Sequence, residues 1–280
     1  KAAGGDRARR FDAEADPATR LRRQRRKALA TAIDADDLQV RYQPQVAFDT
    51  GAVVGAEALV RWFPEDGGEV TPAEFIPLAE ESGLVVPLGR GVLRRACAEA
   101  AHWSVAGRVA VNLSPVQLAR HDVVAMVEEI LADTGLPARS LELEITETVV
   151  HDDVDAVVDR LIALRRLGVA TALDDFGTGF SSLAMLWRLP IDTLKLDRAF
   201  VRDVEFDPRS VEILAEVIAM ARHLGLTSVA EGVETPRQHR LLAELGCDVG
   251  QGFLYGSAAA LPDLDAVLKG AAAFRPRAGA

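Results

Sequence analysis

From residue 38 onward, short runs of apolar and β-branched residues alternate with longer segments in which apolar residues recur at helical spacing. This alternation is typical of repeated β/α units. The pattern predicts strands at residues 38–46, 53–60, 108–113, 141–145, 169–173, 193–196, 227–230 and 248–249.

Several of the intervening segments carry clear helix signals. Apolar residues recur on one helical face in segments 154–164 and 211–224, and each of these helices is predicted to stop at a glycine. Thr235 followed by Pro236 predicts another helix start, because threonine caps helices and proline suits their first turn. A polar, Arg-rich helix is expected over residues 21–37.

Eight strands with interleaved helices predict an α/β fold, a closed (β/α)8 or TIM barrel. The first two strands break the rule, because only residues 47–52 separate them and Asp49, Thr50 and Gly51 are turn formers. A parallel crossover needs about a dozen residues or more. The sequence therefore predicts a modified TIM barrel with one antiparallel strand.

The composition fits a folded chain. Its 280 residues are 49% hydrophobic and 26% charged, which excludes a disordered chain and supplies a sizeable core. No uncharged apolar stretch approaches the ~18 residues of a bilayer span. Two cysteines, Cys97 and Cys247, cannot form a disulfide framework and favour a reducing, cytoplasmic location. Because Lys1 comes first and no signal peptide precedes it, we expect a piece of a longer protein, which itself could be membrane-anchored through upstream segments.

Charge is distributed unevenly. Residues 1–27 carry ten Lys and Arg against four Asp and Glu, whereas the rest of the chain carries 22 basic and 38 acidic residues. An acidic body argues against a DNA-binding surface, which needs a basic face. If this body binds a phosphate compound, a bound divalent cation is the obvious means of attracting it.

Polar side chains gather at the ends of the predicted strands, which meet at one rim of a barrel, where active sites are built. They are Glu57, Asn112, Glu144, Asp174, Asp175, Lys195, Asp197, Glu231 and Gln251. Oxygen donors without histidine or cysteine suit hard cations such as Mg²⁺ or Mn²⁺. Any single acid could instead be a helix cap or a solvated loop residue.

Asp174 and Asp175 are adjacent acids at one strand end, and they would repel each other unless cations lay between them. A shared carboxylate can bridge two metals ~3.5–4 Å apart, which clamps the attacking and leaving oxygens of a phosphoryl transfer. Lys195 beside this cluster can position a water molecule and balance charge. These residues point to metal-assisted phosphoryl transfer.

Nine sequence blocks follow one another in order. They are YQP (42–44), EALVRW (57–62), FIPLAE (75–80), VNLS (111–114), EITE (144–147), DDFGTGFSSL (174–183), KLD (195–197), AEGVE (230–234) and QGF (251–253). On these blocks, residues 38–256 resemble the EAL domain of bacterial cyclic-di-GMP phosphodiesterases.

The resemblance implies a role for each matching residue. One metal would be held by Glu57, Asn112, Glu144 and Asp174, and the second by Asp174, Asp175 and Glu231. The implied catalytic residues are Lys195, which would orient the attacking water, Asp197, which would support it, Glu231 and Glu147. Gln43, Leu59, Arg61 and Gln251 would contact the substrate, Arg61 through a phosphate, which suits its planar fork.

The resemblance also implies a gating loop, made of Phe176, Gly177, Thr178, Gly179, Phe180, Ser181 and Ser182. Glu147 would anchor this loop, and Glu234 would support the same end of the site. Glycines suit a gate that takes unusual backbone angles. A glycine-rich phosphate cradle is the alternative, but the loop lacks the lysine and the spacing of a P-loop.

The implied reaction is hydrolysis of cyclic di-GMP to linear 5′-pGpG, which would lower this bacterial second messenger. Two divalent cations, Mg²⁺ or Mn²⁺, would take part, and Ca²⁺ is expected to inhibit because its coordination is larger and looser. The alternatives are a module that binds cyclic di-GMP without cleaving it, and a scaffold without ligand. The presence of every metal residue and of Glu147 favours the enzyme.

The expected organisation is a linker or GGDEF-like tail at 1–20, a linker helix at 21–37, the EAL domain at 38–270 and a C-terminal tail at 271–280. Residues 2–11 resemble the end of a GGDEF domain, although a solvated basic arm is the plainer alternative. Related domains pair near their gating loop, so a homodimer is expected through elements near residues 176–183. Trp187, which follows this loop, is either an ordinary core or interface residue or part of the dimer contact. Ser257 and Ala258 replace the usual basic residue and proline of the family, so this edge of the substrate site is expected to differ.

Overall fold

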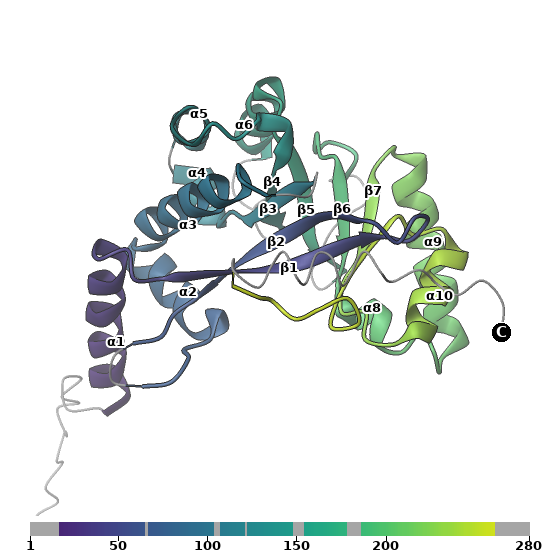
Figure 1. Cartoon of the computed structure of the whole chain (residues 1–280), viewed down its shortest axis with the longest axis horizontal. Helices are drawn as coiled ribbons and strands as arrows, with labels where there is room; N and C mark the ends of the chain where they lie inside the picture. The colour runs from purple at the N-terminus through teal and green to yellow at the C-terminus, as the bar shows by residue number, and fades with distance from the viewer. Residues whose placement is uncertain are drawn as a thin grey trace, which may run out of the picture.

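Eight strands close into a barrel in the order β1 to β8 (Figure 1). The computed structural model describes residues 17–64, 67–103, 107–120, 122–147, 154–177 and 186–260. The strands are β1 (Gln39–Ala47), β2 (Val53–Arg61), β3 (Arg108–Asn112), β4 (Leu141–Thr146), β5 (Ala170–Phe176), β6 (Thr193–Leu196), β7 (Thr227–Ala230) and β8 (Val249–Gln251). The predicted barrel is confirmed. The largest difference is in β5, which continues beyond the predicted end to Phe176.

Strand β1 runs antiparallel to both β2 and β8, whereas the other neighbouring strands are parallel. The β1–β2 hairpin crosses the view of Figure 1, and its turn contains Gly51 at a φ of 66°, which favours glycine. The predicted reversal is confirmed. It brings the first half of β1 beside the carboxyl end of β2, where Gln43 pairs with Glu57.

Helices surround the barrel. They are α1 (Pro17–Asp34), α2 (Pro72–Ser82), α3 (Val85–Ala100), α4 (Pro115–Arg120), α5 (Val123–Thr134), the 3-10 helix η1 (Ala138–Ser140), α6 (Val154–Leu167), α8 (Arg198–Arg202), α9 (Pro208–His223) and α10 (Pro236–Leu245). In Figure 1, α1 lies at one end of the molecule and α9 and α10 lie at the other. The helix expected over residues 21–37 is α1, which begins at Pro17 and ends at Asp34. It is followed by Asp36 in the left-handed region, at a φ of 53°.

The start of α10 follows the predicted capping chemistry. Thr235 Oγ1 accepts a hydrogen bond from the backbone N–H of Gln238 at 3.1 Å, and the Gln238 side chain accepts one from the backbone N–H of Thr235 at 3.0 Å. These reciprocal bonds satisfy two donors that a helix start would otherwise leave unbonded.

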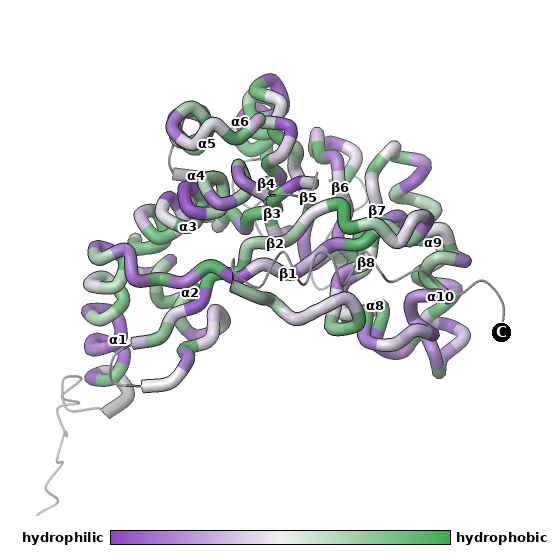
Figure 2. The backbone as a smooth tube through the Cα atoms, viewed as in Figure 1, coloured by the Kyte–Doolittle hydropathy of each residue, from purple (hydrophilic) through white to green (hydrophobic). Residues whose placement is uncertain are grey.

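The hydrophobic core lies between the strands and the helices around them. Leu118, Ile130 and Leu161 from the helices and Leu141 from β4 are fully buried. Each such side chain contributes roughly 1.5–3 kcal/mol through burial. In Figure 2 the hydrophobic colour is clear along β2, and the polar colour recurs on helices such as α1.

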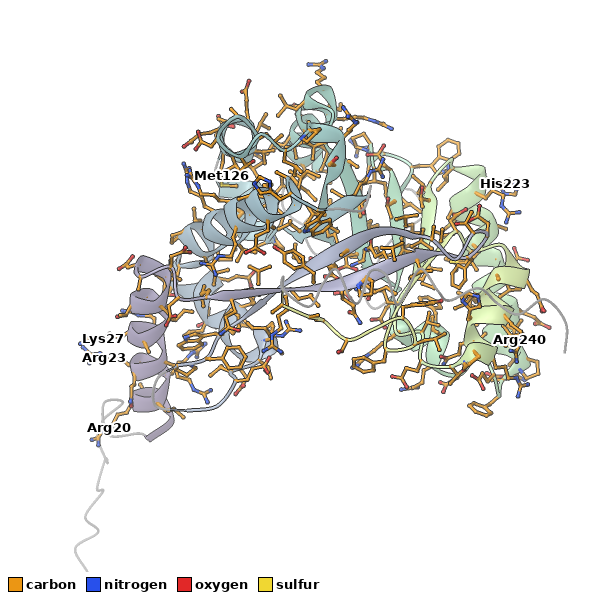
Figure 3. All side chains as sticks on the ribbon, viewed as in Figure 1. Arg20, Arg23, Lys27, Met126, His223 and Arg240 are labelled. Carbon is orange, nitrogen blue, oxygen red and sulfur yellow. The ribbon has the colours of Figure 1, made fainter. Side chains whose placement is uncertain are left out.

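Helix α1 packs on the domain through one face only. Leu29 and Ala32 are buried, whereas Arg23 and Lys27 are exposed and point away from the barrel (Figure 3). No helix within the described parts of the chain has the length and apolar character needed to span a membrane.

Candidate active site

Lys195 lies at the centre of an acidic cluster on the rim where the parallel strands end. Its fully buried Nζ lies 2.7 Å from Glu231 Oε1, 2.8 Å from Glu144 Oε1, 3.2 Å from Asp174 Oδ1 and 3.6 Å from Glu57 Oε2. These carboxylates come from β2, β4, β5 and the segment after β7. The closure of the barrel thus brings together acids that lie far apart in the sequence.

Amide side chains hold the carboxylate of Glu57 in place. Asn112 Nδ2 donates to its Oε1 at 2.7 Å, and Gln251 Nε2 donates to its Oε2 at 2.5 Å. Gln251 Nε2 also lies 3.2 Å from Gln43 Oε1, and its own Oε1 accepts from Gln45 Nε2 at 3.1 Å. Strands β1, β2, β3 and β8 therefore share one polar network.

Lys195 and the carboxylates change one another's protonation. Burial by itself lowers the pKa of Lys195, but the Glu144 and Glu57 charges outweigh it and raise that pKa well above its ordinary value. Burial, and next the Glu57 charge, raise the pKa of Glu144 well above the usual range. Burial also raises the pKa of Glu231 to about 7, although the Lys195 charge opposes the shift. One ammonium group is not enough to balance this cluster.

Asp174, Asp175 and Glu231 form a second grouping beside the first. One ligand oxygen from each lies within 4.8 Å of the others. Asp175 has a φ of 56°, a strained value for a residue other than glycine. Backbone strain of this kind clusters at active sites, and here it occurs where two consecutive acids reach one site.

The donor chemistry of the cluster fits a hard divalent cation. Glu57, Asn112, Glu144 and Asp174 offer oxygen atoms, and no histidine or cysteine lies among them. Glu144 Oε2 is buried and accepts no hydrogen bond from the described residues. A buried carboxylate oxygen is costly without a donor or a cation. The residues of the second predicted metal group therefore lie close together on this rim, and those of the first lie around Lys195 and Glu57 on the same rim.

A cavity of about 540 Å³ opens above the cluster, and the four predicted substrate residues all line it. They are Gln43, Leu59, Arg61 and Gln251. The Arg61 guanidinium lies 3.1 Å from Glu69 Oε1 through Nε and donates to Val60 O at 2.9 Å through Nη1. The cavity floor includes Glu57, Asp174 and Glu231, so one space reaches both acids and arginine.

Glu147 contacts the start of the predicted gating loop. Its Oε1 accepts a hydrogen bond from the backbone N–H of Gly177 at 2.8 Å. Gly177 has a φ of 96°, and a Cβ there would lie 2.2 Å from the Phe200 ring, so this position requires glycine. Phe176 is the last residue of β5. The other residues of that loop, 178–182, lie outside the described residues.

The two remaining predicted residues have clear positions. Asp197 Oδ1 accepts a hydrogen bond from the backbone N–H of Ala199 at 2.8 Å and caps α8. For this acid the contact is the helix cap that the sequence left open as an alternative to a site role. The charge of Asp197 also helps to raise the pKa of Asp175, after burial and the charge of Asp174. Glu234 lines the cavity beside Gly232.

Sequence reasoning missed several residues that line the cavity. Arg41, Glu69 and Arg198 belong to it, and none was singled out. For Arg41 a signal existed, because it stands two residues before Gln43 and alternate strand residues share a face. The sequence holds no equivalent signal for Glu69, which reaches the cavity from the segment between β2 and α2.

The edge expected to differ from the family also lines the cavity. Ser257 and Ala258 contribute to it without a charged side chain. Ala259 forms two backbone hydrogen bonds with Tyr42, of 2.8 and 2.9 Å, and Gly256 O accepts from Gln43 Nε2 at 3.2 Å. This segment is therefore held against β1.

Comparison with known proteins defines the class. The EAL domain model matches residues 26–258, and the chain belongs to the EAL domain family. The bifunctional diguanylate cyclase/cyclic di-GMP phosphodiesterase MucR of Pseudomonas aeruginosa is 41% identical over 232 residues, which cover 81% of this chain and 34% of MucR. The chain spans about a third of the length of the first curated relatives it matches.

Solved structures show the same fold. The PaMucR phosphodiesterase in complex with c-di-GMP has 40% sequence identity and a TM-score of 0.82, covering 86% of this chain and 99% of that chain. The calcium and cy-diGMP complex of Klebsiella pneumoniae BlrP1 has 33% identity and a TM-score of 0.71, covering 80% of this chain and 56% of that chain.

Proposed function

We propose that this domain is a cyclic-di-GMP phosphodiesterase, which hydrolyses one phosphodiester bond to give linear 5′-pGpG with the help of two divalent cations. The observation that carries the proposal is the convergence of four carboxylates on Lys195 Nζ, next to the Asp174, Asp175 and Glu231 grouping. The c-di-GMP phosphodiesterases among its relatives support the choice of substrate.

Glu57, Asn112, Glu144 and Asp174 would hold one cation, and Asp174, Asp175 and Glu231 the other. When bound, such cations polarise the phosphate and make water more acidic. The excess of carboxylates over the one ammonium group supports this assignment, because a bound cation would allow these acids to stay ionised.

The chain's own residues would position the reactants. The Lys195 ammonium group has only donors, so it can orient a water molecule by hydrogen bonding to its oxygen. The planar guanidinium of Arg61 can bind a phosphate oxygen. In this structure the guanidinium instead pairs with the carboxylate of Glu69. Glu147 would anchor the gating loop through its hydrogen bond with Gly177. Such positioning supplies much of the rate in phosphoryl transfer.

The test is direct. Purified protein is incubated with cyclic di-GMP and Mg²⁺ or Mn²⁺, and the products are separated by chromatography. We expect 5′-pGpG to accumulate, excess chelator to abolish turnover, and Ca²⁺ to inhibit it. Unchanged turnover in excess chelator would refute the metal assignment. Tight binding of cyclic di-GMP without any product would show the binding module instead.

We further propose the surroundings of this domain in the whole protein. A GGDEF-like domain would precede residue 21, as the bifunctional name of MucR suggests, and the enzyme would act in the cytoplasm. A homodimer would form near the gating loop, where Trp187 is 80% exposed. Measuring the molecular mass in solution of the wild-type protein and of Trp187→Ala tests this dimer. The wild type is expected to have the mass of a dimer, and the variant a lower mass.

A further inference from the structure

Arg41 lies on the inner face of β1, one step farther toward the cavity mouth than Gln43. In the antiparallel register, Arg41 pairs with Leu59 and Gln43 pairs with Glu57. Residues two apart on a strand are about 6.8 Å apart and point to the same side. Arg41 and Leu59 therefore face the same cavity as the catalytic cluster, at a level above Glu57.

The guanidinium of Arg41 has no carboxylate within 4.0 Å among the described residues, and its buried Nε donates no hydrogen bond within that part of the chain. Its Cζ lies 5.3 Å from the centre of the Phe63 ring, which supports one face of the group. Arg61 differs, because it is already engaged by Glu69 and Val60 O. Arg41 thus keeps donors for a ligand.

The wall near Arg41 combines uncharged residues with the ion pair of Arg61 and Glu69. Leu59 lies across the hairpin, and Ser257 and Ala258 belong to the segment that the Ala259–Tyr42 hydrogen bonds hold against β1. The acids that would take part in phosphate chemistry lie deeper, at the level of Glu57 and below. A flat, neutral group with a polar edge fits this part of the cavity better than a second phosphate does.

We propose that Arg41 recognises a guanine base of the substrate by donating to the O6 and N7 acceptors of its outer edge. The inference rests on the proposed function and adds the group that selects the base. Arginine reads this edge of guanine with two hydrogen bonds, whereas adenine presents an amino donor in place of O6. Arg41 is then a specificity-determining residue and takes no part in bond cleavage.

The experiment compares wild-type protein with Arg41→Ala and Arg41→Lys. For cyclic di-GMP we expect KM to rise about tenfold in Arg41→Ala, equivalent to about 1.4 kcal/mol, with kcat within twofold. Arg41→Lys restores only part of the loss, because a lysine cannot donate two bonds in one plane. The exposed Arg23→Ala on α1 is the matched control and leaves both constants unchanged.

Two further substrates separate the roles. Bis(p-nitrophenyl) phosphate has no base, so its rate is expected to be equal in wild type and Arg41→Ala. Cyclic di-AMP is expected to bind weakly and equally to both. An unchanged KM for cyclic di-GMP, or an equal loss with all three substrates, would overturn the role of Arg41 in base recognition.

The proposed function can fail separately. If wild-type protein does not cleave cyclic di-GMP, that function is wrong, and calorimetry with cyclic di-GMP in Ca²⁺ still tests Arg41. A tenfold weaker dissociation constant for Arg41→Ala supports base recognition, and equal constants, or no binding by wild type, refute it. Thermal melting of each variant shows whether the fold is intact.

Discussion

Gln251 at the end of β8 donates a hydrogen bond of 2.5 Å to Glu57 on β2, across the intervening strand β1. The two residues are 194 positions apart in the sequence. Strand β1 is antiparallel to both of these strands, and Gln43 on β1 accepts a hydrogen bond from the same Gln251 amide. The reversed strand therefore belongs to the site as much as the parallel ones do.

Replacing Lys195 by Met tests its role as the internal counter-charge. In chelator we expect the free energy of unfolding to fall by about 3–5 kcal/mol, because the variant leaves buried carboxylates without their cation. Mg²⁺ is expected to restore part of this loss, and turnover is expected to be abolished. Denaturant unfolding with and without Mg²⁺ measures the effect. Lys27→Met on the exposed face of α1 is the control, and equal stability of both variants would contradict the prediction.

Asp174 belongs to both proposed metal groups, so Asp174→Asn is expected to weaken Mn²⁺ binding by at least about 100-fold. The amide is close in size but carries no charge. Titration calorimetry with Mn²⁺ measures the affinity. Asp155→Asn removes a carboxylate that pairs with Arg188 on the surface, and this variant is expected to bind Mn²⁺ normally. Wild-type affinity in Asp174→Asn would remove Asp174 from the site.

Glu147→Ala removes the acceptor for the Gly177 N–H group. We expect kcat to fall by about 100-fold, because small misplacements of a catalytic site cost about this much. Glu147→Gln keeps an acceptor oxygen and is expected to retain more activity. Glu128→Ala, at an exposed position of α5, serves as the control. If the Ala and Gln variants are equally active, the hydrogen bond between Glu147 and Gly177 does not contribute to kcat.

Thr235→Ala tests a structural contact away from the chemistry. Loss of the helix cap on α10 is expected to lower the free energy of unfolding by about 1 kcal/mol, while kcat stays unchanged. Thr31→Ala is a useful comparison, since Thr31 Oγ1 bonds to Lys27 O inside a helix and caps nothing. Similar losses from both substitutions would argue against a special role of the cap.

Local chemistry was enough to predict much of the fold. The short turn at 47–52 forces the first two strands to be antiparallel, because no crossover fits that length. Thr235 and Pro236 were sufficient to place the start of α10. The end of β5 was not predictable, since Asp174 and Asp175 disfavour a strand by composition. Pairing of Asp174 with Thr146 and of Phe176 with Leu196 extends the strand, with an irregular register before Phe176.

By itself the sequence determined the order of the strands, the reversal of the first, and the oxygen-rich residues at the strand ends, because these follow from local periodicity and turn length. Only the tertiary structure decided that Lys195 contacts four carboxylates and that Arg41 shares a cavity with Gln251. These relations depend on distances between side chains that closure of the barrel brings together, and such distances are not encoded in any local segment.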